Sequence, residues 1–189
     1  MTSASRPAVL TTQSDDPADF LSDVKALRER ARKHIGEGAV TDDYGLNAKV
    51  AVKVLNAALA TELICTLRYR QHSFAAKGIN SEPIAREFLI HSNEELAHAD
   101  LIAKRIVQLG GSPGMEPGKL AEHSHSEYAT CATLEAMIRE NLVAERIAIE
   151  SYREMVAFFA QHDPTTRTML EGVLAMEEEH AEELADLLH

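Results

Sequence analysis

The chain has 189 residues, which is enough for one domain with a sizeable core but not for two full domains. Hydrophobic residues make up 45% of it, and 30 Asp and Glu against 19 Lys and Arg give a formal net charge of -11. An acidic balance of this size argues against a general nucleic-acid binder and suits a protein that attracts cations.

Neither end of the chain nor its cysteines indicate an extracellular or membrane protein. The N-terminus lacks the apolar segment of a secretory signal. Each long helical pattern contains charges, so no stretch is expected to cross a membrane. Cys65 and Cys131 follow neither a disulfide pattern nor a zinc pattern. We therefore expect a cytoplasmic protein that makes no membrane contact.

Residues 1–46 are predicted to form an N-terminal extension with one short helix. Asp16 and Pro17 are typical of a helix start, with Asp as the N-cap and Pro at the first helical position. The helix should run to about His34, where glycines follow. The extension contains six Lys and Arg against eight Asp and Glu, a net charge of -2. Binding of DNA through a basic tail is therefore not expected.

Residues 47–189 are predicted to form a four-helix bundle. Helical periodicity covers residues 47–77, 81–109, 130–162 and 164–189, and Gly and Pro occupy the breaks. The first and last pairs are each joined by a few residues, so each pair should be an antiparallel hairpin. Residues 112–129 are long enough for a crossover along the bundle between helices two and three. Because no β-type alternation appears, the predicted fold class is all-α.

The two halves of the bundle carry the same polar pattern. Each half has one Glu in its first helix, followed 33 or 32 residues later by a Glu-x-x-His in its second. Residues three apart on a helix lie on one face, so each Glu and His can reach one ion. The six residues are Glu62, Glu95, His98, Glu145, Glu177 and His180.

These six residues all fall on the apolar stripes of their helices. A carboxylate buried without a partner costs several kcal/mol or takes up a proton. Four carboxylates at one level of a core, by contrast, neutralise two divalent ions. A single Glu-x-x-His more often marks a solvated face, but two at matching positions are hard to obtain by accident. The pattern therefore predicts a carboxylate-bridged dimetal site.

The repeat extends to tyrosine. Tyr69 follows Glu62 by seven residues, and Tyr152 follows Glu145 by seven. Each lies two turns along the same face as its glutamate. For Tyr152 we expect a core aromatic. For Tyr69 a core position and a redox or hydrogen-bonding role beside the metals remain open.

Across about residues 47–189 the chain resembles the bacterioferritins and related ferritin-like ferroxidases. The resemblance rests on Glu62 with Tyr69, on the run from Glu95 to Asp100, on Glu145, and on the run from Glu177 to His180. It implies that Glu95 and Glu177 bridge two iron ions and that His98 and His180 each bind one. It also implies that Glu62 and Glu145 are terminal ligands and that Tyr69 adjoins the site.

Two departures from the bacterioferritins change the expected cofactor and assembly. Leu96 stands where those proteins have their haem-binding methionine, so haem is not expected. Only nine residues follow His180, too few for their fifth helix. In this respect the chain is similar to the Dps-type and Dps-like mini-ferritins, and self-assembly into a dodecamer is favoured over a 24-mer. Cys65 and Cys131 are expected to lie too far apart to pair.

The resemblance implies a ferroxidase that stores or detoxifies iron. Two Fe(II) ions per subunit would be oxidised by O₂ or H₂O₂, with Tyr69 and the six ligands as the catalytic set. Manganese in place of iron is left open. The alternatives are a non-storage diiron or dimanganese oxidase, peroxidase or catalase, and a non-enzymatic iron buffer or helical scaffold. His91 and Glu94 either assist iron transfer or are a core histidine and an exposed charge.

Overall fold

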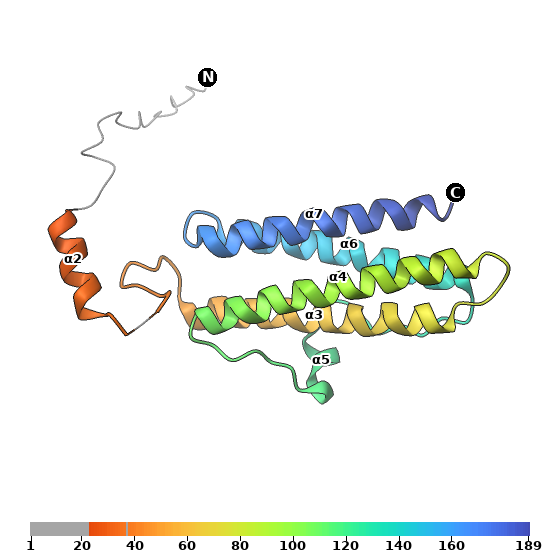
Figure 1. Ribbon diagram of the computed structural model, residues 1–189, viewed down its shortest axis with the longest axis horizontal. Coiled ribbons are helices and arrows are strands. Elements are labelled where there is room, and N and C mark those ends of the chain that lie inside the picture. The colour runs from red at the N-terminus through yellow and green to blue at the C-terminus, as the bar shows by residue number, and fades with distance from the viewer. Residues whose placement is uncertain (1–22, 37) are drawn as a thin grey trace, which may run out of the picture. The chain divides into compact units, whose positions relative to one another are not determined.

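The structure, a computed structural model, describes residues 23–36 and 38–189. Within these residues it contains six α-helices and no strand, which confirms the all-α fold class (Figure 1). The described residues fall into two compact units that divide between Asp42 and Asp43.

The first unit contains α2 (Val24–Lys33). The side chain of Asp23 caps its first turn by accepting a hydrogen bond from the amide of Lys25 at 2.8 Å. The predicted helix start at Asp16 and Pro17 lies outside the described residues. The predicted helix end near His34 is confirmed, since His34 is the C-cap.

The second unit contains a four-helix bundle with a crossover between its second and third helices (Figure 1). Its helices are α3 (Ala48–Ala75), α4 (Ser81–Gln108), α6 (Leu134–Phe159) and α7 (Pro164–Asp186). α3 packs along α4, and α6 packs along α7. Contacts of α3 with α6 and of α4 with α7 join the two hairpins. This is the bundle that the sequence predicts.

Side-chain caps mark where α3 and α6 begin. Asn47 accepts a hydrogen bond from the amide of Lys49 at the start of α3. The third helix was predicted from residue 130 but begins at Leu134, because the Thr133 side chain accepts from the amide of Ala136 and caps the helix there. Cys131 therefore lies in the crossover rather than on α6. Both cysteines are free thiols.

The crossover is held along α3 by hydrogen bonds, and it contains a short helix, α5 (Pro117–His123), that was not predicted. The buried guanidinium of Arg68 donates to the carbonyl of Glu127 at 2.9 Å. Thr61 Oγ1 accepts from the amide of His125 at 2.9 Å. These bonds satisfy polar groups that the crossover would otherwise leave unpaired against the bundle.

The end of α4 needs two glycines for two different reasons. Gly110 has a φ of 77°, a conformation that residues with a Cβ rarely adopt. At Gly111 a Cβ would lie 2.5 Å from a methyl group of Val52 on α3. The chain can therefore turn into the crossover while it stays close to α3.

Among the described residues, α3 has the length and composition of a helix that could cross a membrane, with a hydropathy of 1.6 over 18 residues. On length and composition alone, the charges in α3 therefore do not exclude it, contrary to the prediction that no helical stretch is apolar enough. The reason lies in the bundle, where α3 contacts α4, α5 and α6 and is buried on more than one face. A helix that is apolar nearly all round is typical of a core. Its buried residues include Glu62 and Arg68.

A buried ion pair ties α4 to the start of α7. Arg105 donates to both carboxylate oxygens of Asp163 at 2.9 and 3.0 Å, and Tyr44 donates to the same carboxylate at 2.7 Å. We expect Tyr44→Phe to lower the free energy of unfolding by about 1 kcal/mol, because one hydrogen bond to a buried acceptor is lost. Denaturant unfolding of the two proteins measures this. An unchanged midpoint would show that water replaces the tyrosine hydroxyl.

Candidate metal centre

Each of the six predicted ligands lies at one level in the bundle core. Glu62 comes from α3, Glu95 and His98 from α4, Glu145 from α6, and Glu177 and His180 from α7. None exceeds 6% exposure. Buried apolar residues such as Leu59, Ile102 and Leu184 lie one turn from ligands on the same helices. The helical period therefore turns the polar residues inward as well.

The ligand atoms form two overlapping groups. Glu62, Glu95, His98 and Glu177 have one oxygen or nitrogen each within 4.8 Å of one another. A second group with the same spacing is Glu95, Glu145, Glu177 and His180. Because Glu95 and Glu177 belong to both, the arrangement suits two ions that share two carboxylates.

Each imidazole faces the carboxylates with Nδ1. His98 Nδ1 lies 3.1 Å from Glu177, 3.4 Å from Glu95 and 3.5 Å from Glu62. His180 Nδ1 lies 3.5 Å from Glu95 and 3.7 Å from Glu177. Despite these distances, several of the atoms make no well-oriented hydrogen bond. They are Glu62 Oε2, Glu95 Oε1, His98 Nδ1, both Glu177 oxygens and His180 Nδ1. The donor set therefore fits two divalent cations, which these unpaired atoms would bind.

The crowding of carboxylates shifts the protonation of the site. Burial, followed by the charges of Glu95 and Glu177, raises the pKa of Glu62 and of Glu145 well above the ordinary carboxyl value. Burial would also raise the pKa of Glu95, but the close imidazoles of His180 and His98 outweigh it and lower that pKa.

The pKa values of the two imidazoles are raised, whereas burial without a partner lowers the pKa of a histidine. Burial alone lowers the pKa of His98, but the close carboxylates of Glu177, Glu62 and Glu95 raise it to about 12. Burial likewise lowers the pKa of His180, and Glu177 and Glu95 raise it to about 11. Without metal, protons therefore supply the positive charge that the carboxylates need.

Each of the two tyrosines contacts a glutamate in the other half of the bundle. Tyr69 on α3 donates a hydrogen bond to Glu145 on α6, and Tyr152 on α6 donates one to Glu62 on α3. Both tyrosines are at most 1% exposed. Tyr152, expected as a core aromatic only, thus has the same contact with the site as Tyr69. The seven-residue spacing was the signal, and it is the same in both halves.

We expect Tyr69→Phe and Tyr152→Phe each to weaken metal binding by about 10-fold, because each frees one carboxylate from its hydrogen bond. Titration of the metal-free variants with Fe(II) without oxygen measures the two affinities. A loss in Tyr69→Phe alone would mean that the halves are not equivalent.

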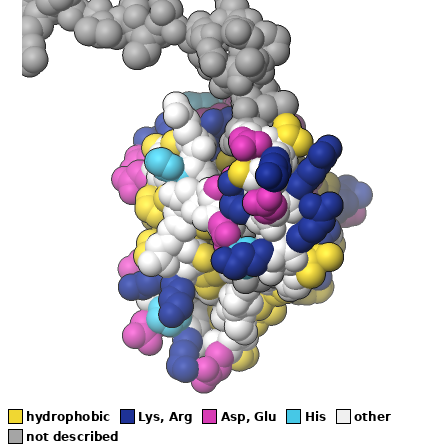
Figure 2. All heavy atoms as spheres, turned by 90° about the vertical axis from the view of Figure 1, so that its left-hand side faces the viewer, with side chains coloured by type: hydrophobic (Ala, Val, Ile, Leu, Met, Phe, Trp, Pro, Cys, Tyr) yellow, Lys and Arg dark blue, Asp and Glu magenta, His cyan; other side chains and the backbone are white. Residues whose placement is uncertain are grey.

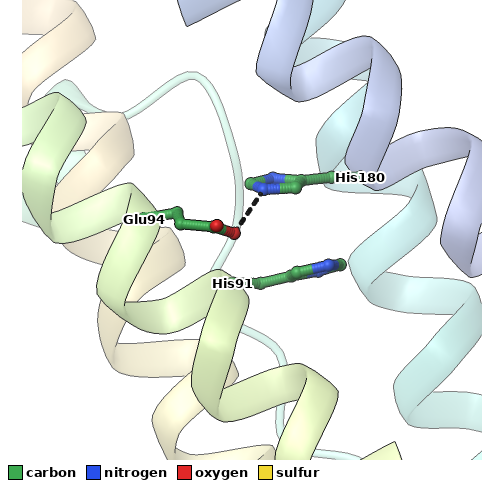
Figure 3. Close-up of side chains that lie close together, drawn as sticks. All are labelled: His91, Glu94 and His180. Atoms are coloured by element: carbon green, nitrogen blue, oxygen red, sulfur yellow. Dashed lines mark hydrogen bonds and ion pairs between the residues drawn. The ribbon is translucent and has the colours of Figure 1, made fainter.

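Glu94 and His91 both contact His180 (Figure 3). Glu94 Oε2 lies 3.0 Å from His180 Nε2, which leaves Nδ1 of that ring for the carboxylate cluster. The ring of His91 stacks on that of His180, with 4.1 Å between centroids and 20° between planes. Glu94, on which the sequence is ambiguous, is therefore a partner of a predicted ligand.

Residues 52–189 match the family model of the ferritin-like domain. The chain belongs to the ferritin-like family. It is 30% identical over 156 residues to a nutrient stress-induced DNA-binding protein of a Synechococcus strain, covering 76% of this chain and 85% of that protein. It is also 30% identical over 140 residues to a bacterioferritin of Rhodobacter capsulatus, covering 72% and 80%.

Solved ferritin-like structures share the fold. A dodecameric thioferritin, the bacterioferritin-related protein from Bacteroides fragilis, is 34% identical with a TM-score of 0.73, covering 76% of this chain and 87% of that one. A variant of Dps1 from Mycobacterium smegmatis superimposes with a TM-score of 0.71 at 19% identity, covering 79% and 100%. The likeness to the second shows the fold alone.

Proposed function

We propose that this ferritin-like chain is a ferroxidase, which oxidises Fe(II) with O₂ or H₂O₂ at a dinuclear centre within each subunit and passes the iron into storage. The observation that carries the proposal is the pair of overlapping ligand groups with Glu95 and Glu177 in common. Fe(II) is the substrate. Once bound, two ions supply the two electrons that an oxidant such as O₂ takes up in pairs.

The six carboxylate and imidazole residues would bind the iron, and the two tyrosines would hold the terminal carboxylates in place. Glu95 and Glu177 would bridge the ions, Glu62 and His98 would complete one site, and Glu145 and His180 the other. Hard carboxylate oxygens favour Fe(III) over Fe(II), which assists oxidation. Tyr69 and Tyr152 orient the terminal carboxylates by donating hydrogen bonds to them, and each hydroxyl proton stays on its phenolic oxygen. Because burial and the neighbouring glutamates raise the pKa of both phenols well above their ordinary value, both stay protonated.

We propose that the chain assembles into a dodecamer rather than a 24-mer. The proposal is supported by the similar Bacteroides fragilis protein, which is dodecameric. Light scattering or native mass spectrometry measures the assembly. A monomer or dimer would remove storage from the proposal, although oxidation would still be possible. The cytoplasmic location stays a prediction.

We do not extend to this chain the DNA binding named for its Synechococcus relative. The extension of residues 1–46 has six Lys and Arg against eight Asp and Glu. On the face seen in Figure 2, Lys and Arg side chains of the described residues are interspersed with Asp and Glu. Such a surface provides no continuous field for a phosphate backbone.

The experiment that tests the proposal follows Fe(III) absorbance after Fe(II) is added in air or with H₂O₂. We expect oxidation much faster than in the protein-free control. No acceleration with either oxidant would contradict the ferroxidase and favour an iron buffer or scaffold. Oxygen release from H₂O₂ by the manganese-loaded protein, without iron oxidation, would favour the dimanganese catalase.

A further inference from the structure

A second cluster of metal-binding side chains lies beside the six-residue site but shares none of its members. Glu87 and His91 come from α4, and Glu183 comes from α7. His91 Nε2 lies 2.9 Å from Glu183 Oε2 and 3.5 Å from Glu87 Oε1. One ligand atom from each residue lies within 4.8 Å of the others, a spacing that a single ion can span.

The cluster is open to solvent on its acidic side. A surface pocket of about 300 Å³ lies along the seam between the start of α4 and the end of α7, and Glu87, Glu183 and Asp186 line it. The side chains of Glu87 and Glu183 are 34% and 44% exposed, while that of His91 is 1% exposed. The pocket therefore exposes the two carboxylates to solvent, and the buried Nε2 of His91 lies within 3.5 Å of both.

His91 is buried without a second hydrogen-bond partner. Its Nε2 points at the two carboxylates, whereas its Nδ1 is buried and unpaired. In most buried histidines a bond to one nitrogen decides which nitrogen carries the proton. The 2.9 Å contact with the Glu183 carboxylate keeps the proton on Nε2 while the site holds no ion. Because Nδ1 has no competing partner, it can carry the proton once an ion replaces that contact and binds the lone pair of Nε2. The two carboxylates supply the charge that balances a divalent ion.

The ring of His91 stacks on that of His180, so this cluster and the six-residue site are separated by one pair of imidazoles (Figure 3). Glu94 reaches His180 Nε2 on that side and is therefore occupied with the other site. The two sites are adjacent, but they use different carboxylates and different imidazoles.

We propose that Glu87, His91 and Glu183 bind one divalent transition-metal ion in an accessory mononuclear site. One imidazole nitrogen with two carboxylates suits Fe²⁺, Mn²⁺, Co²⁺ or Zn²⁺ better than Mg²⁺ or Ca²⁺, which prefer oxygen ligands alone. The open pocket leaves the remaining coordination positions to water. The proposal goes beyond the proposed function, since binding at this site requires no oxidation.

The test is an oxygen-free titration of the metal-free, full-length protein with Co(II), followed by equilibrium dialysis and metal analysis. We expect about three Co(II) per chain in the wild type and about two in Glu87→Gln/Glu183→Gln, because the amides cannot balance the ion's charge. Glu182→Gln, which removes a neighbouring exposed carboxylate from α7, should keep about three. Glu87→Gln/Glu183→Gln should also lose a visible absorption band of Co(II), and Glu182→Gln should retain that band.

Two Co(II) in the wild type, or three in the double variant, would overturn the accessory site. The six-residue site is tested separately by Glu95→Ala/Glu177→Ala, which should retain about one Co(II). If that variant binds as much as the wild type while Glu87→Gln/Glu183→Gln loses one, the accessory site stands and the dinuclear centre fails. Because Glu87 and Glu183 are partly exposed, their replacement should leave the helical circular dichroism unchanged.

Discussion

Glu95→Ala is expected to abolish binding of the two ions of the dinuclear centre, and to slow iron oxidation by at least about 100-fold. Glu95 belongs to both ligand groups and lies 3.5 Å or less from both imidazoles. Its removal therefore deprives both ions of a shared carboxylate at once. Metal analysis after dialysis against Fe(II) without oxygen, followed by oxidation in air, measures both effects.

Glu178→Ala is the control, because Glu178 follows the proposed ligand Glu177 directly on α7 but points outward. Its side chain is 47% exposed and pairs only with Arg153 among the described residues. A surface ion pair of this kind is worth about 0–1 kcal/mol, so metal binding should be unchanged. Equal losses in the two variants would place the metals elsewhere in the bundle. Circular dichroism of both variants checks that the fold is kept.

Metal binding near neutral pH is expected to release at least about two protons for every two divalent ions. Without metal, the raised pKa values keep His98 and His180 as imidazolium ions, and the raised pKa values of Glu62 and Glu145 favour the protonated carboxyl groups. Two divalent ions replace this positive charge and need the same atoms. A pH indicator in weakly buffered protein measures the release.

The same protons predict how stability depends on pH. The pKa values of His98 and His180 rise from 6.5 to about 12 and about 11 in the folded protein. The stability they contribute is complete below about pH 6.5 and is lost as the pH rises toward their folded values. The raised pKa values of Glu62 and Glu145 likewise make the folded protein less stable as the pH rises. Metal-free protein should therefore melt at lower temperature at about pH 9 than at about pH 6.5.

Metal-loaded protein should show little of this dependence, since its charge balance no longer relies on protons. The lowered pKa of Glu95 does not affect this comparison, because it changes the stability only at acidic pH. Thermal melts of both forms across this range provide the comparison. A release of less than one proton per ion, or parallel pH profiles for the two forms, would contradict the assignment.

Helical periodicity made the bundle and its site predictable before any contact was known. A helix buries one face, so a polar residue in register with Leu55, Leu59 or Phe88 must be buried as well. The near-equal spacing in the two halves then places Glu62, Glu95, Glu145 and Glu177 at one level. The lengths of the connections determine which helices are neighbours, and all four bundle helices are found within a few residues of their predicted ranges.

Periodicity does not show what a side chain touches on another helix. Tyr152 and Tyr69 have the same spacing from their own glutamates, yet each contacts the glutamate of the opposite helix. Likewise, Glu94 looks like a surface charge in the sequence, and its contact with His180 depends on the packing of α4 against α7.

The sequence by itself determined the all-α class, the paired hairpins and the six carboxylate and imidazole residues, because each depends on spacing within one helix or one connection. Only the tertiary structure showed that each tyrosine contacts the glutamate of the opposite helix, that the crossover contains the helix α5, and that Glu87, His91 and Glu183 form a cluster. These features depend on the rotation and axial offset of one helix against another, which side-chain packing and buried hydrogen bonds determine together. The dimetal pattern was therefore readable in the chain, whereas its surroundings had to be seen in the fold.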